Sequence, residues 1–519
     1  MSRYARSVHH LATRPQQVVA TSLAQLADGL AGSTEVERHG DLDVAVTGIS
    51  LSTARTQPGD LYAALPGARA HGADFAAEAR AAGAVGVLTD PAGLDRVPPG
   101  TPTVLVAEPR RVLGRLAATI YGDPAGRLRV IGVTGTQGKT TTTRLLEQGL
   151  TASGVSSAVV GTVGTRIAGQ DVETELTTPE APDLHGLFAV MVEQGVDTCA
   201  MEVSSHALVL GRVDGVVFDV ATFLNLGRDH LDFHSDVDDY FAAKAGLFTP
   251  GRAAAGLTNV DDQFGRRLLD VATIPMSTYS SRGGDADWRA TDVELSPSGA
   301  TFTVLGPGVE VRAGVRLPGE FSVSNALAAI ASAALAGLDP QRVAEGVAGV
   351  DGVPGRLEPV TRGHDFTVVV DYSHKPDALE AVLATLRPLT AGRVIAVIGA
   401  GGDRDSLKRP VMGEIAARVA DVVVVTDDNP RTEDPAAIRA AVLEGTRGGS
   451  AEVVEQGDRR LAIREAVRRA RTGDVVLIAG KGHETGQRVG SVVHPFDDRV
   501  VAAEEIEAAT EAARQESTS

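Results

Sequence analysis

The stretch that most constrains the fold is an apolar segment that runs into a glycine-rich loop and ends at Lys139. Residues 130–141 read Val-Ile-Gly-Val-Thr-Gly-Thr-Gln-Gly-Lys-Thr-Thr, and a helical pattern follows. Gly135 and Gly138 allow the backbone to turn its N–H groups toward an anion, and the lysine and the start of a helix add positive charge. Val133 stands where the usual phosphate-loop spacing places a glycine, so this loop is a variant of that motif. A surface turn with a chance lysine is the alternative, but the flanking strand and helix favour a nucleotide-binding α/β unit.

Length and composition predict a large globular protein with several cores. A chain of 519 residues is expected to form about three domains. Hydrophobic residues make up 43% and aromatic residues only 4%, so the cores are expected to consist mainly of Ala, Val, Leu and Ile. The net charge of −18 argues against a nucleic-acid partner or an anionic membrane surface, because both require basic faces.

The sequence contains no predicted export signal or membrane anchor. The first 20 residues have no apolar core segment, and the longest apolar-rich run, residues 326–338, is too short to cross a bilayer. Cys199 is the only cysteine, so neither an internal disulfide nor a cysteine metal cluster can form. These features predict a cytoplasmic protein.

Strand and helix patterns alternate along most of the chain, which predicts an α/β fold. Turn-rich joints near residues 122–126 and 352–355 suggest an N-terminal domain at residues 1–124, a central domain at 125–354 and a C-terminal domain at 355–519. Gly352 and Gly355 suit a hinge or a plain turn. In the C-terminal domain, alternating strands and helices predict a doubly wound sheet. We expect strands at 44–49, 61–65, 85–89, 103–106, 198–202, 218–226, 366–371, 394–398, 422–426 and 475–478, helices at 74–82, 142–150 and 322–338, an antiparallel ribbon at 302–317 and a disordered tail at 511–519.

Three polar residues follow the loop where such a sheet places its site, at or beyond strand ends. They are Glu202, His230 and Lys244. A carboxylate and an imidazole can bind Mg²⁺, but a lysine ammonium cannot. Taken alone, Lys244 is expected to be a surface residue on an amphipathic helix.

Eight short motifs follow one another along nearly the whole chain: Gly-Thr-x-Gly-Lys-Thr-Thr, Glu-Val-Ser-Ser-His, Asp-His-Leu-Asp, Ala-Ala-Lys, Asp-Tyr-x-His-x-Pro-Asp, Gly-Gly-Asp-Arg-Asp, Asp-Asn-Pro-Arg and Gly-Lys-Gly-His-Glu. In this order they resemble the motifs of the Mur ligases of peptidoglycan synthesis, and among these the members that add the third residue of the stem peptide. Each motif alone is weak. Together they identify the chain as a member of this family.

The resemblance implies a uridine-nucleotide-binding N-terminal α/β domain, a central P-loop ATPase-like α/β domain and a Rossmann-like C-terminal domain. It also implies the reaction, in which a substrate carboxylate attacks the γ-phosphate of ATP. The resulting acyl phosphate is captured by an amine, and phosphate leaves. The implied substrates are UDP-MurNAc-L-Ala-D-Glu and meso-diaminopimelate, and the implied state is a monomer.

The resemblance also assigns residues to ATP and to two Mg²⁺ ions. The implied ATP contacts are Gly135, Thr136, Gln137, Gly138, Lys139, Thr140, Thr141, Asn325 and Arg356. The implied metal ligands are Thr140, Glu202, His230 and Lys244, the last as a carbamate formed with CO₂, and the catalytic set is Lys139, His230, Lys244, Asp371 and His374. Carbamate formation requires a free amine, and desolvation by Phe241, Leu247 and Phe248 is expected to lower the pKa of Lys244.

The implied contacts to the UDP-MurNAc-dipeptide are Ser52, Thr53, His71, Thr177, Thr178, Ser205 and Arg212. The family's usual Asp-Ser-Arg is replaced here by Ser-Thr-Ala, and Arg55 comes one position late. This block could therefore be only a turn between strands. As isolated residues, Thr178 and Ser205 are more typical of helix caps, whereas Arg212 suits a substrate carboxylate.

The implied diaminopimelate contacts are Arg404, Asp428, Asn429, Pro430, Arg431, Gly480 and Glu484. Diaminopimelate differs from lysine by one carboxylate, for which Arg431 offers a bidentate partner, although it could also be a solvated loop residue. The alternatives are an L-lysine-adding ligase, a folylpolyglutamate or cyanophycin-type ligase, and a non-catalytic nucleotide-binding protein. Retention of Lys139, Glu202, His230 and Lys244 argues against the last.

Overall fold

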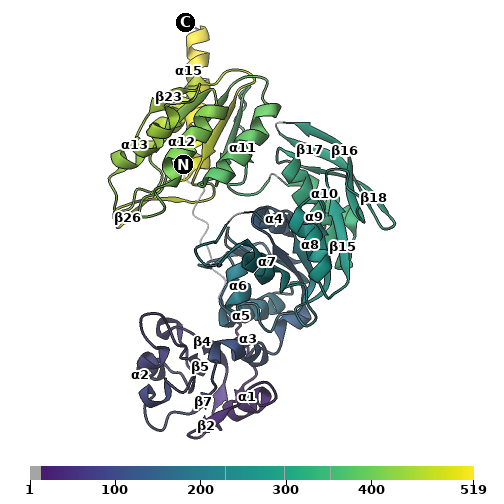
Figure 1. The fold of residues 1–519 in the computed structure, drawn as a ribbon, viewed down its shortest axis with the longest axis vertical. Helices are drawn as coiled ribbons and strands as arrows, with labels where there is room; N and C mark the ends of the chain where they lie inside the picture. Colours follow the sequence, from purple (N-terminus) through teal and green to yellow (C-terminus); the bar gives the residue numbers. More distant parts are fainter. Residues whose placement is uncertain (1–12, 228, 297, 351, 519) are drawn as a thin grey trace. The chain divides into compact units, whose positions relative to one another are not determined.

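The computed structural model describes residues 13–518 except 228, 297 and 351 (Figure 1). Of the first 20 residues, in which the sequence analysis finds no apolar core segment, residues 1–12 lie outside the described ranges. The chain divides into two compact units. The first comprises Met1–Arg289, Leu305–Val309 and Leu327–Gly346, and the second comprises Ala290–Val304, Glu310–Ala326 and Val347–Ser519. No helix among the described residues is both long and apolar enough to cross a membrane.

The first unit begins with a five-stranded sheet in the order β2-β7-β6-β5-β4. Strands β4 to β7 are parallel, whereas β2 is antiparallel to its neighbour. The strands predicted at 85–89 and 103–106 are confirmed in shortened form, and the one predicted at 61–65 is found at Asp60–Ala63. The strand predicted at 44–49 is divided into β3 and β4. The elements are β1 (Thr21–Ser22), α1 (Leu23–Leu30), β2 (Glu37–His39), β3 (Ala45–Val46), β4 (Gly48–Ser50), β5 (Asp60–Ala63), α2 (Ala76–Ala81), β6 (Gly86–Thr89), β7 (Thr103–Leu105) and α3 (Pro109–Ile120).

The same unit contains a larger sheet whose centre is six parallel strands in the order β9-β12-β8-β13-β14-β15. Strands β10 and β11 extend one edge in antiparallel fashion. Gly132 in β8 is required by packing, because a Cβ there would lie 2.7 Å from Cδ1 of Phe218. The elements are β8 (Arg129–Thr134), α4 (Lys139–Ala152), β9 (Ser157–Val160), β10 (Thr165–Ile167), β11 (Gln170–Val172), α5 (Ala181–Glu193), β12 (Thr198–Glu202), α6 (Ser205–Val209), β13 (Phe218–Phe223), α7 (Val237–Ala245), β14 (Ala253–Asn259), α8 (Gln263–Val271) and β15 (Met276–Ser280).

The predicted ribbon and the buried helix after it are both present. The ribbon consists of β17 (Gly299–Gly306) and β18 (Val309–Val315), with β16 (Trp288–Ser296) as the neighbouring strand. The helix is α9 (Glu320–Leu335), and α10 (Pro340–Gly349) follows it. Within the first unit, the Ser332 hydroxyl on α9 lies 2.7 Å from that of Thr222 on β13, so a polar pair is satisfied inside this core.

The C-terminal part of the second unit is a doubly wound sheet, as predicted (Figure 1). Its order is β19-β20-β24-β21-β22-β23, and all neighbours except β19 and β20 are parallel. Alternate residues enter different cores: Val369 and Ala396 pack with α11, α12 and α13, whereas Val368 and Ile395 pack with α14 and α15. The elements are β19 (Glu358–Pro359), β20 (Thr367–Asp371), α11 (Pro376–Leu389), β21 (Val394–Ile398), α12 (Lys408–Val419), β22 (Val422–Val425), α13 (Pro435–Thr446), β23 (Glu452–Glu455), α14 (Arg459–Arg469), β24 (Val475–Ala479) and α15 (Asp498–Thr518).

The prediction was wrong for one feature of this part, the C-terminal tail, and it missed another, a β-hairpin. The expected disordered tail is wrong, because α15 continues to Thr518; its Ala- and Glu-rich sequence has high intrinsic helix propensity. A hairpin of β25 (Gly486–Val489) and β26 (Val492–Pro495) lies before this helix. Strand β25 bridges to Arg431, so the hairpin holds the loop that follows β22.

Candidate active site

The glycine-rich loop connects β8 to α4, as the sequence predicts. Gly135 and Gly138 have φ values of 155° and 85°, which a residue with a side chain rarely adopts. Asn225 holds the loop from the side: its carbonyl accepts from Thr136 N–H at 3.0 Å, and its Oδ1 accepts from Gln137 N–H at 2.9 Å. The first N–H groups of α4 have no partner within the helix and are available to an anion.

Lys139 lies across this loop. Its Nζ donates to the carbonyl oxygen of Gly135 at 2.8 Å and to that of Thr136 at 3.1 Å. The side chain is half-buried, and its positive charge is held where the phosphates of a nucleotide are predicted to bind. Thr140 and Thr141 follow in the first turn of α4 and are buried.

Lys244 is buried against the same loop, so the surface position suggested by its helix pattern alone is wrong. Its residue exposure is 1%, and its Nζ donates to Gly135 O at 3.0 Å and to the Thr134 hydroxyl at 3.4 Å. Burial lowers the pKa of Lys244 well below its usual value of 10.5, and the positive charge of Lys139 lowers it further. The structure therefore favours a neutral amine here.

Tyr240 is a neighbour of Lys244 that the sequence did not predict. The Lys244 Nζ lies 4.7 Å from the centre of its ring, while Phe241, Leu247 and Phe248 are all buried in the surrounding core, as expected. The Tyr240 hydroxyl lies 3.1 Å from that of Thr136, and burial raises its pKa to about 12. This phenol stays neutral and links α7 to the phosphate loop.

Glu202 ends β12 as a buried carboxylate. Its Oε1 accepts from Thr162 N–H at 2.8 Å, and its Oε2 accepts from the Thr162 hydroxyl at 3.2 Å. Gly161 makes room for it, since a Cβ at that position would lie 2.4 Å from Oε1. The Thr162 hydroxyl in turn lies 3.0 Å from that of Thr177, a predicted substrate contact.

His230 lies in a cluster of rings, in a left-handed conformation with φ of 55°. Its ring centre is 4.7 Å from that of His206 and 6.0 Å from that of Tyr240, and His206 stacks on Phe233 at 4.0 Å. Burial lowers the pKa of His206, and the nearby imidazole of His234 lowers it further. Only the pattern Glu-Val-Ser-Ser-His could have pointed to His206.

The predicted metal ligands fit Mg²⁺ only if Lys244 changes its charge. Within the described ranges, no three His, Cys, Asp or Glu side chains are grouped to hold a metal ion. Of the four predicted ligands, Glu202 supplies a carboxylate, His230 supplies an imidazole and Thr140 supplies a hydroxyl. A carbamate on the neutral Lys244 amine would supply the anionic oxygen that Mg²⁺ prefers.

Arg212 is paired with Glu180, a residue that the sequence analysis missed. Its Nε donates to Glu180 Oε1 at 2.8 Å, and Arg110 on α3 donates to Oε2 at 3.0 Å. The Thr178 hydroxyl donates to the carbonyl of Glu202 at 2.8 Å and so is not a helix cap. The cap of α6 is Ser204, while the buried Ser205 hydroxyl has no hydrogen-bond partner among the described residues.

The predicted contacts to the uridine-diphosphate part of the substrate follow neighbouring parallel strands. Ser52 and Thr53 come directly after β4, and Thr53 donates to Glu78 at 2.8 Å. His71 follows β5, lies 2.9 Å from Asp90 through its Nε2 and accepts from Ala73 N–H at 3.0 Å. The loops share one sheet edge because the strands are parallel.

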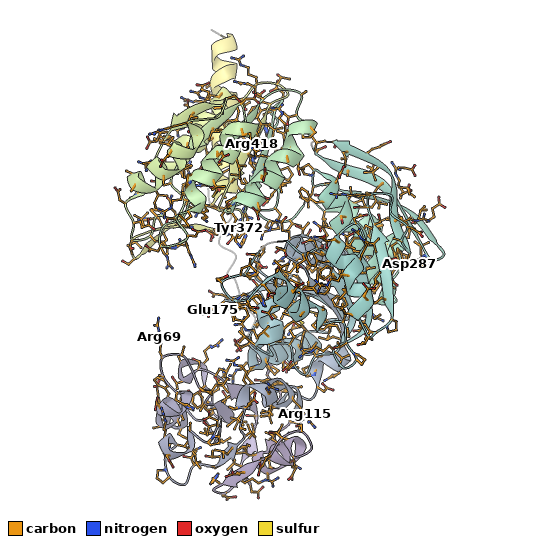
Figure 2. All side chains as sticks on the ribbon, viewed as in Figure 1. Arg69, Arg115, Glu175, Asp287, Tyr372 and Arg418 are labelled. Atoms are coloured by element: carbon orange, nitrogen blue, oxygen red, sulfur yellow. The ribbon has the colours of Figure 1, made fainter. Side chains whose placement is uncertain are left out.

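In the second unit, four predicted residues lie near the start of the C-terminal sheet or on α9. Asp371 is buried and accepts from the N–H groups of Leu357 and Ser373, both at 2.8 Å. It therefore holds the backbone around the joint. The Arg356 guanidinium lies 4.7 Å from the ring centre of Tyr372, labelled in Figure 2. The remaining two are His374, whose pKa is lowered by burial, and Asn325, which is 6% exposed.

Asn429 and Glu484 meet at the carboxyl edge of the same sheet. Asn429 follows β22 and its Nδ2 donates to Glu484 Oε2 at 2.9 Å. Gly480 follows β24 with φ of 118°, and a Cβ there would lie 2.6 Å from an oxygen of the buried Asp428. These predicted residues are therefore brought together, with Pro430 next to them in the loop.

Arg431 is held by the hairpin rather than left in solvent. Its φ is 52°, its N–H donates to Arg488 O at 3.0 Å, and its carbonyl accepts from Gly490 N–H at 2.6 Å. Its guanidinium donates to Gly402 O at 2.6 Å. Arg404, in the same loop as Gly402, is exposed.

A buried ion pair supports both loops. Arg459 and Asp498 are fully buried and lie 2.7 Å apart. Arg459 also donates to the carbonyls of Asp427 at 3.4 Å and Ala479 at 3.0 Å, the residues before Asp428 and Gly480. One guanidinium thus ties the ends of β22 and β24 together.

Fold and site together define a nucleotide-binding α/β protein. Comparison with family models identifies the Mur ligase family, catalytic domain at residues 45–121, the Mur ligase middle domain at 133–333 and the Mur ligase glutamate ligase domain at 355–482. The chain belongs to the Mur ligase family.

Relatives match over nearly their whole length. The UDP-N-acetylmuramoyl-L-alanyl-D-glutamate--2,6-diaminopimelate ligase of Streptomyces avermitilis is 55% identical over 503 residues, covering 95% of this chain and 98% of that protein. The ligase of the same name from Corynebacterium glutamicum is 49% identical over 94% of this chain and 96% of its own length. A solved structure of a ligase with this name has a TM-score of 0.70 and 32% identity, and it covers 94% of this chain and 99% of that one.

The depressed pKa of Lys244 predicts a pH-dependent cost to stability. Above pH 10.5 the amine is neutral in both the folded and the unfolded chain; as the pH falls, the unfolded chain takes up the proton first, so folding stability declines. Lys244→Met should remove this decline and raise the free energy of unfolding at pH 7 relative to wild type. Gly135 O keeps a donor from Lys139. Urea unfolding of the wild type and the variant in CO₂-depleted buffers between pH 7 and 10 measures the free energy of unfolding and its change with pH.

Lys139→Met is the matched control, because it removes the half-buried lysine from the same carbonyl. A change of pH slope as large in this variant as in Lys244→Met would contradict the assignment to Lys244.

Proposed function

We propose that the protein is the ATP-dependent ligase that joins meso-diaminopimelate to UDP-MurNAc-L-Ala-D-Glu, as the names of its relatives state for them. The observation that carries the reaction class is the contact of Lys139 and Lys244 with one carbonyl of the phosphate loop. The proposed choice of amino acid is based on the Asp428–Arg431 loop and on the β25–β26 hairpin and Arg459, which hold that loop. We place the enzyme in the cytoplasm as a monomer.

Activation of the substrate acid requires two anions to approach each other. A carboxylate is a poor acceptor for an amine because its leaving group would be oxide or hydroxide, and phosphorylation replaces that with phosphate. Lys139 and the first N–H groups of α4 would bind the triphosphate and offset its charge. Bound Mg²⁺, held by Thr140, Glu202, His230 and modified Lys244, would supply further charge neutralisation. Asn325, Arg356, Asp371 and His374 stay predicted contacts to the nucleotide.

Lys244 is proposed to carry a carbamate. The neutral amine attacks the carbon of CO₂, a C–N bond forms, and one proton is released to water. The product is an anion beside the Lys139 ammonium, so the charge that disfavoured a protonated Lys244 favours its carbamate.

The substrate carboxylate is proposed to bind at Arg212 in competition with Glu180. Glu180 accepts from both Arg212 and Arg110 in this structure, so it holds the guanidinium in a fixed orientation until a ligand carboxylate takes its place. The buried Ser205 hydroxyl, which has no partner among the described residues, is a further donor for the same ligand.

A turnover assay tests the function directly. Purified enzyme with ATP, Mg²⁺ and UDP-MurNAc-L-Ala-D-Glu should release ADP only when meso-diaminopimelate is added. ¹⁸O in the substrate carboxylate should appear in the released phosphate. Equal or faster turnover with L-lysine would contradict the specificity. ADP release that ignores the amino acid would indicate a nucleotide-binding switch instead.

The carbamate predicts a specific modification. Enzyme equilibrated with ¹³C-bicarbonate should show one carbamate carbon resonance by NMR that is absent in Lys244→Met. The signal should weaken at low pH, where the amine is protonated and carbamate is lost. An unchanged resonance in the variant would place the modification on another residue.

Arg431 predicts the preference for diaminopimelate over lysine. Arg431→Gln should lower the ratio of kcat/KM for diaminopimelate to that for L-lysine by about 10- to 150-fold, the worth of a hydrogen bond to a charged group. Arg488→Gln, on an exposed arginine of the adjacent hairpin, is the matched control and should leave the ratio unchanged. An unchanged ratio in Arg431→Gln would assign the extra carboxylate to another residue.

A further inference from the structure

Lys481 is a buried lysine to which the function proposed above assigns no role. The chain contains only five lysines among its 49 basic residues, so arginine supplies nearly all of its positive surface charge. The Lys481 side chain is 0% exposed, although a lysine is almost never fully buried unless it is paired. It lies between Gly480 and Gly482, directly after β24.

Lys481 forms a closed triangle with two predicted diaminopimelate contacts. Its Nζ donates to Asn429 Oδ1 at 3.2 Å and to Glu484 Oε2 at 3.3 Å. Asn429 Nδ2 donates to the same Glu484 oxygen at 2.9 Å, which closes the triangle. Each side of the triangle is therefore a hydrogen bond, and one of them is also an ion pair.

The triangle determines which atoms can face a ligand. Asn429 Oδ1 accepts from both Lys481 and the Arg488 N–H, so the amide oxygen points inward. One Nδ2 hydrogen is used by Glu484, and the other is left to donate. Glu484 is half-buried and uses Oε2 within the triangle, which leaves Oε1 as an acceptor. A donor beside an anionic acceptor matches the carboxylate and ammonium of an amino acid.

The glycines on both sides of Lys481 are closely packed. A Cβ at Gly480 would lie 2.6 Å from Asp428 Oδ2, and one at Gly482 would lie 2.7 Å from Cβ of Tyr372. A compact ammonium can donate in several directions from one point, whereas a guanidinium needs a planar space. The Lys481 ammonium uses this freedom to donate to both Asn429 and Glu484.

We propose that Lys481 is a positioning residue for the amino-acid substrate: it holds Asn429 with its amide N–H outward and Glu484 as a carboxylate, and so creates a receptor for a zwitterionic amino-acid end. The proposal rests on the function proposed above, because it takes the amino acid bound at this loop as the substrate. Lys481 does not touch the ligand itself.

The test is a double-mutant cycle with Lys481→Met and Glu484→Gln. Lys481→Met should raise the KM for meso-diaminopimelate by about 10- to 100-fold, and leave the KM for ATP within about twofold. In the Glu484→Gln background, the same change should raise the KM for diaminopimelate by less than about threefold, because the group that Lys481 positions is already altered. Full additivity, or an equal rise in the KM for ATP, would overturn the proposal and indicate a general structural effect.

Two further variants complete the experiment. Lys481→Gln keeps a donor for Asn429 and is shorter, so the same cycle run with it decides the question if Lys481→Met does not fold. Arg418→Met deletes a charge from an exposed ion pair on α12, labelled in Figure 2, and should leave both KM values unchanged.

Wild-type turnover separates this proposal from the proposed function. If the wild type uses L-lysine instead of diaminopimelate, the specificity fails, and the cycle is run with lysine, which has the same zwitterionic end. If the cycle is then additive, the positioning role fails as well.

Discussion

Two lysine side chains donate to one carbonyl oxygen, that of Gly135, and the chemistry of the first unit depends on this contact. Lys139 is half-buried, whereas Lys244 is enclosed by α7 and the sheet. Burial lowers the pKa of Lys244 well below its usual value, and the positive charge of Lys139 lowers it further, so a neutral amine is favoured. That neutral amine is the property that a carbamate requires, and it arises from packing rather than from any unusual residue.

In the C-terminal part of the second unit, by contrast, two buried basic side chains are paired with carboxylates. Arg459 and Lys481 keep counter-ions, Asp498 and Glu484, within hydrogen-bond distance. Burying a charge is costly unless the charge is paired and hydrogen-bonded, and both of these groups are. Arg459 ties the ends of two parallel strands together, and Lys481 orients the side chains that follow them. The contacts of Lys481 and the ends of β22 and β24 lie at the carboxyl edge of the sheet, where α/β sheets bind their ligands.

Much of the fold was predictable because strand and helix periodicities are local properties. β21 was predicted at its observed residues, 394–398, since its run of branched apolar residues is short and bounded. The disorder predicted for the tail is wrong for residues 511–518, because the alanines and glutamates there have a helix propensity that the polar composition alone does not indicate. The supporting residues Asn225, Tyr240 and Glu180 were missed, since they act through contacts between segments far apart in the chain.

The sequence by itself determined the α/β class, the phosphate loop and the family, because these follow from periodicity, from glycine positions and from motifs in a fixed order. Only the tertiary structure decided the charge state and orientation of the site residues. The sequence pattern of its helix predicts a surface position for Lys244, whereas the structure buries it against Gly135, and this burial lowers its pKa well below the usual value. The sequence does not specify how the Asn429 amide is oriented, and in the structure Lys481 holds the amide oxygen inward. A pKa and an amide orientation depend on neighbours in space, which local sequence patterns do not specify.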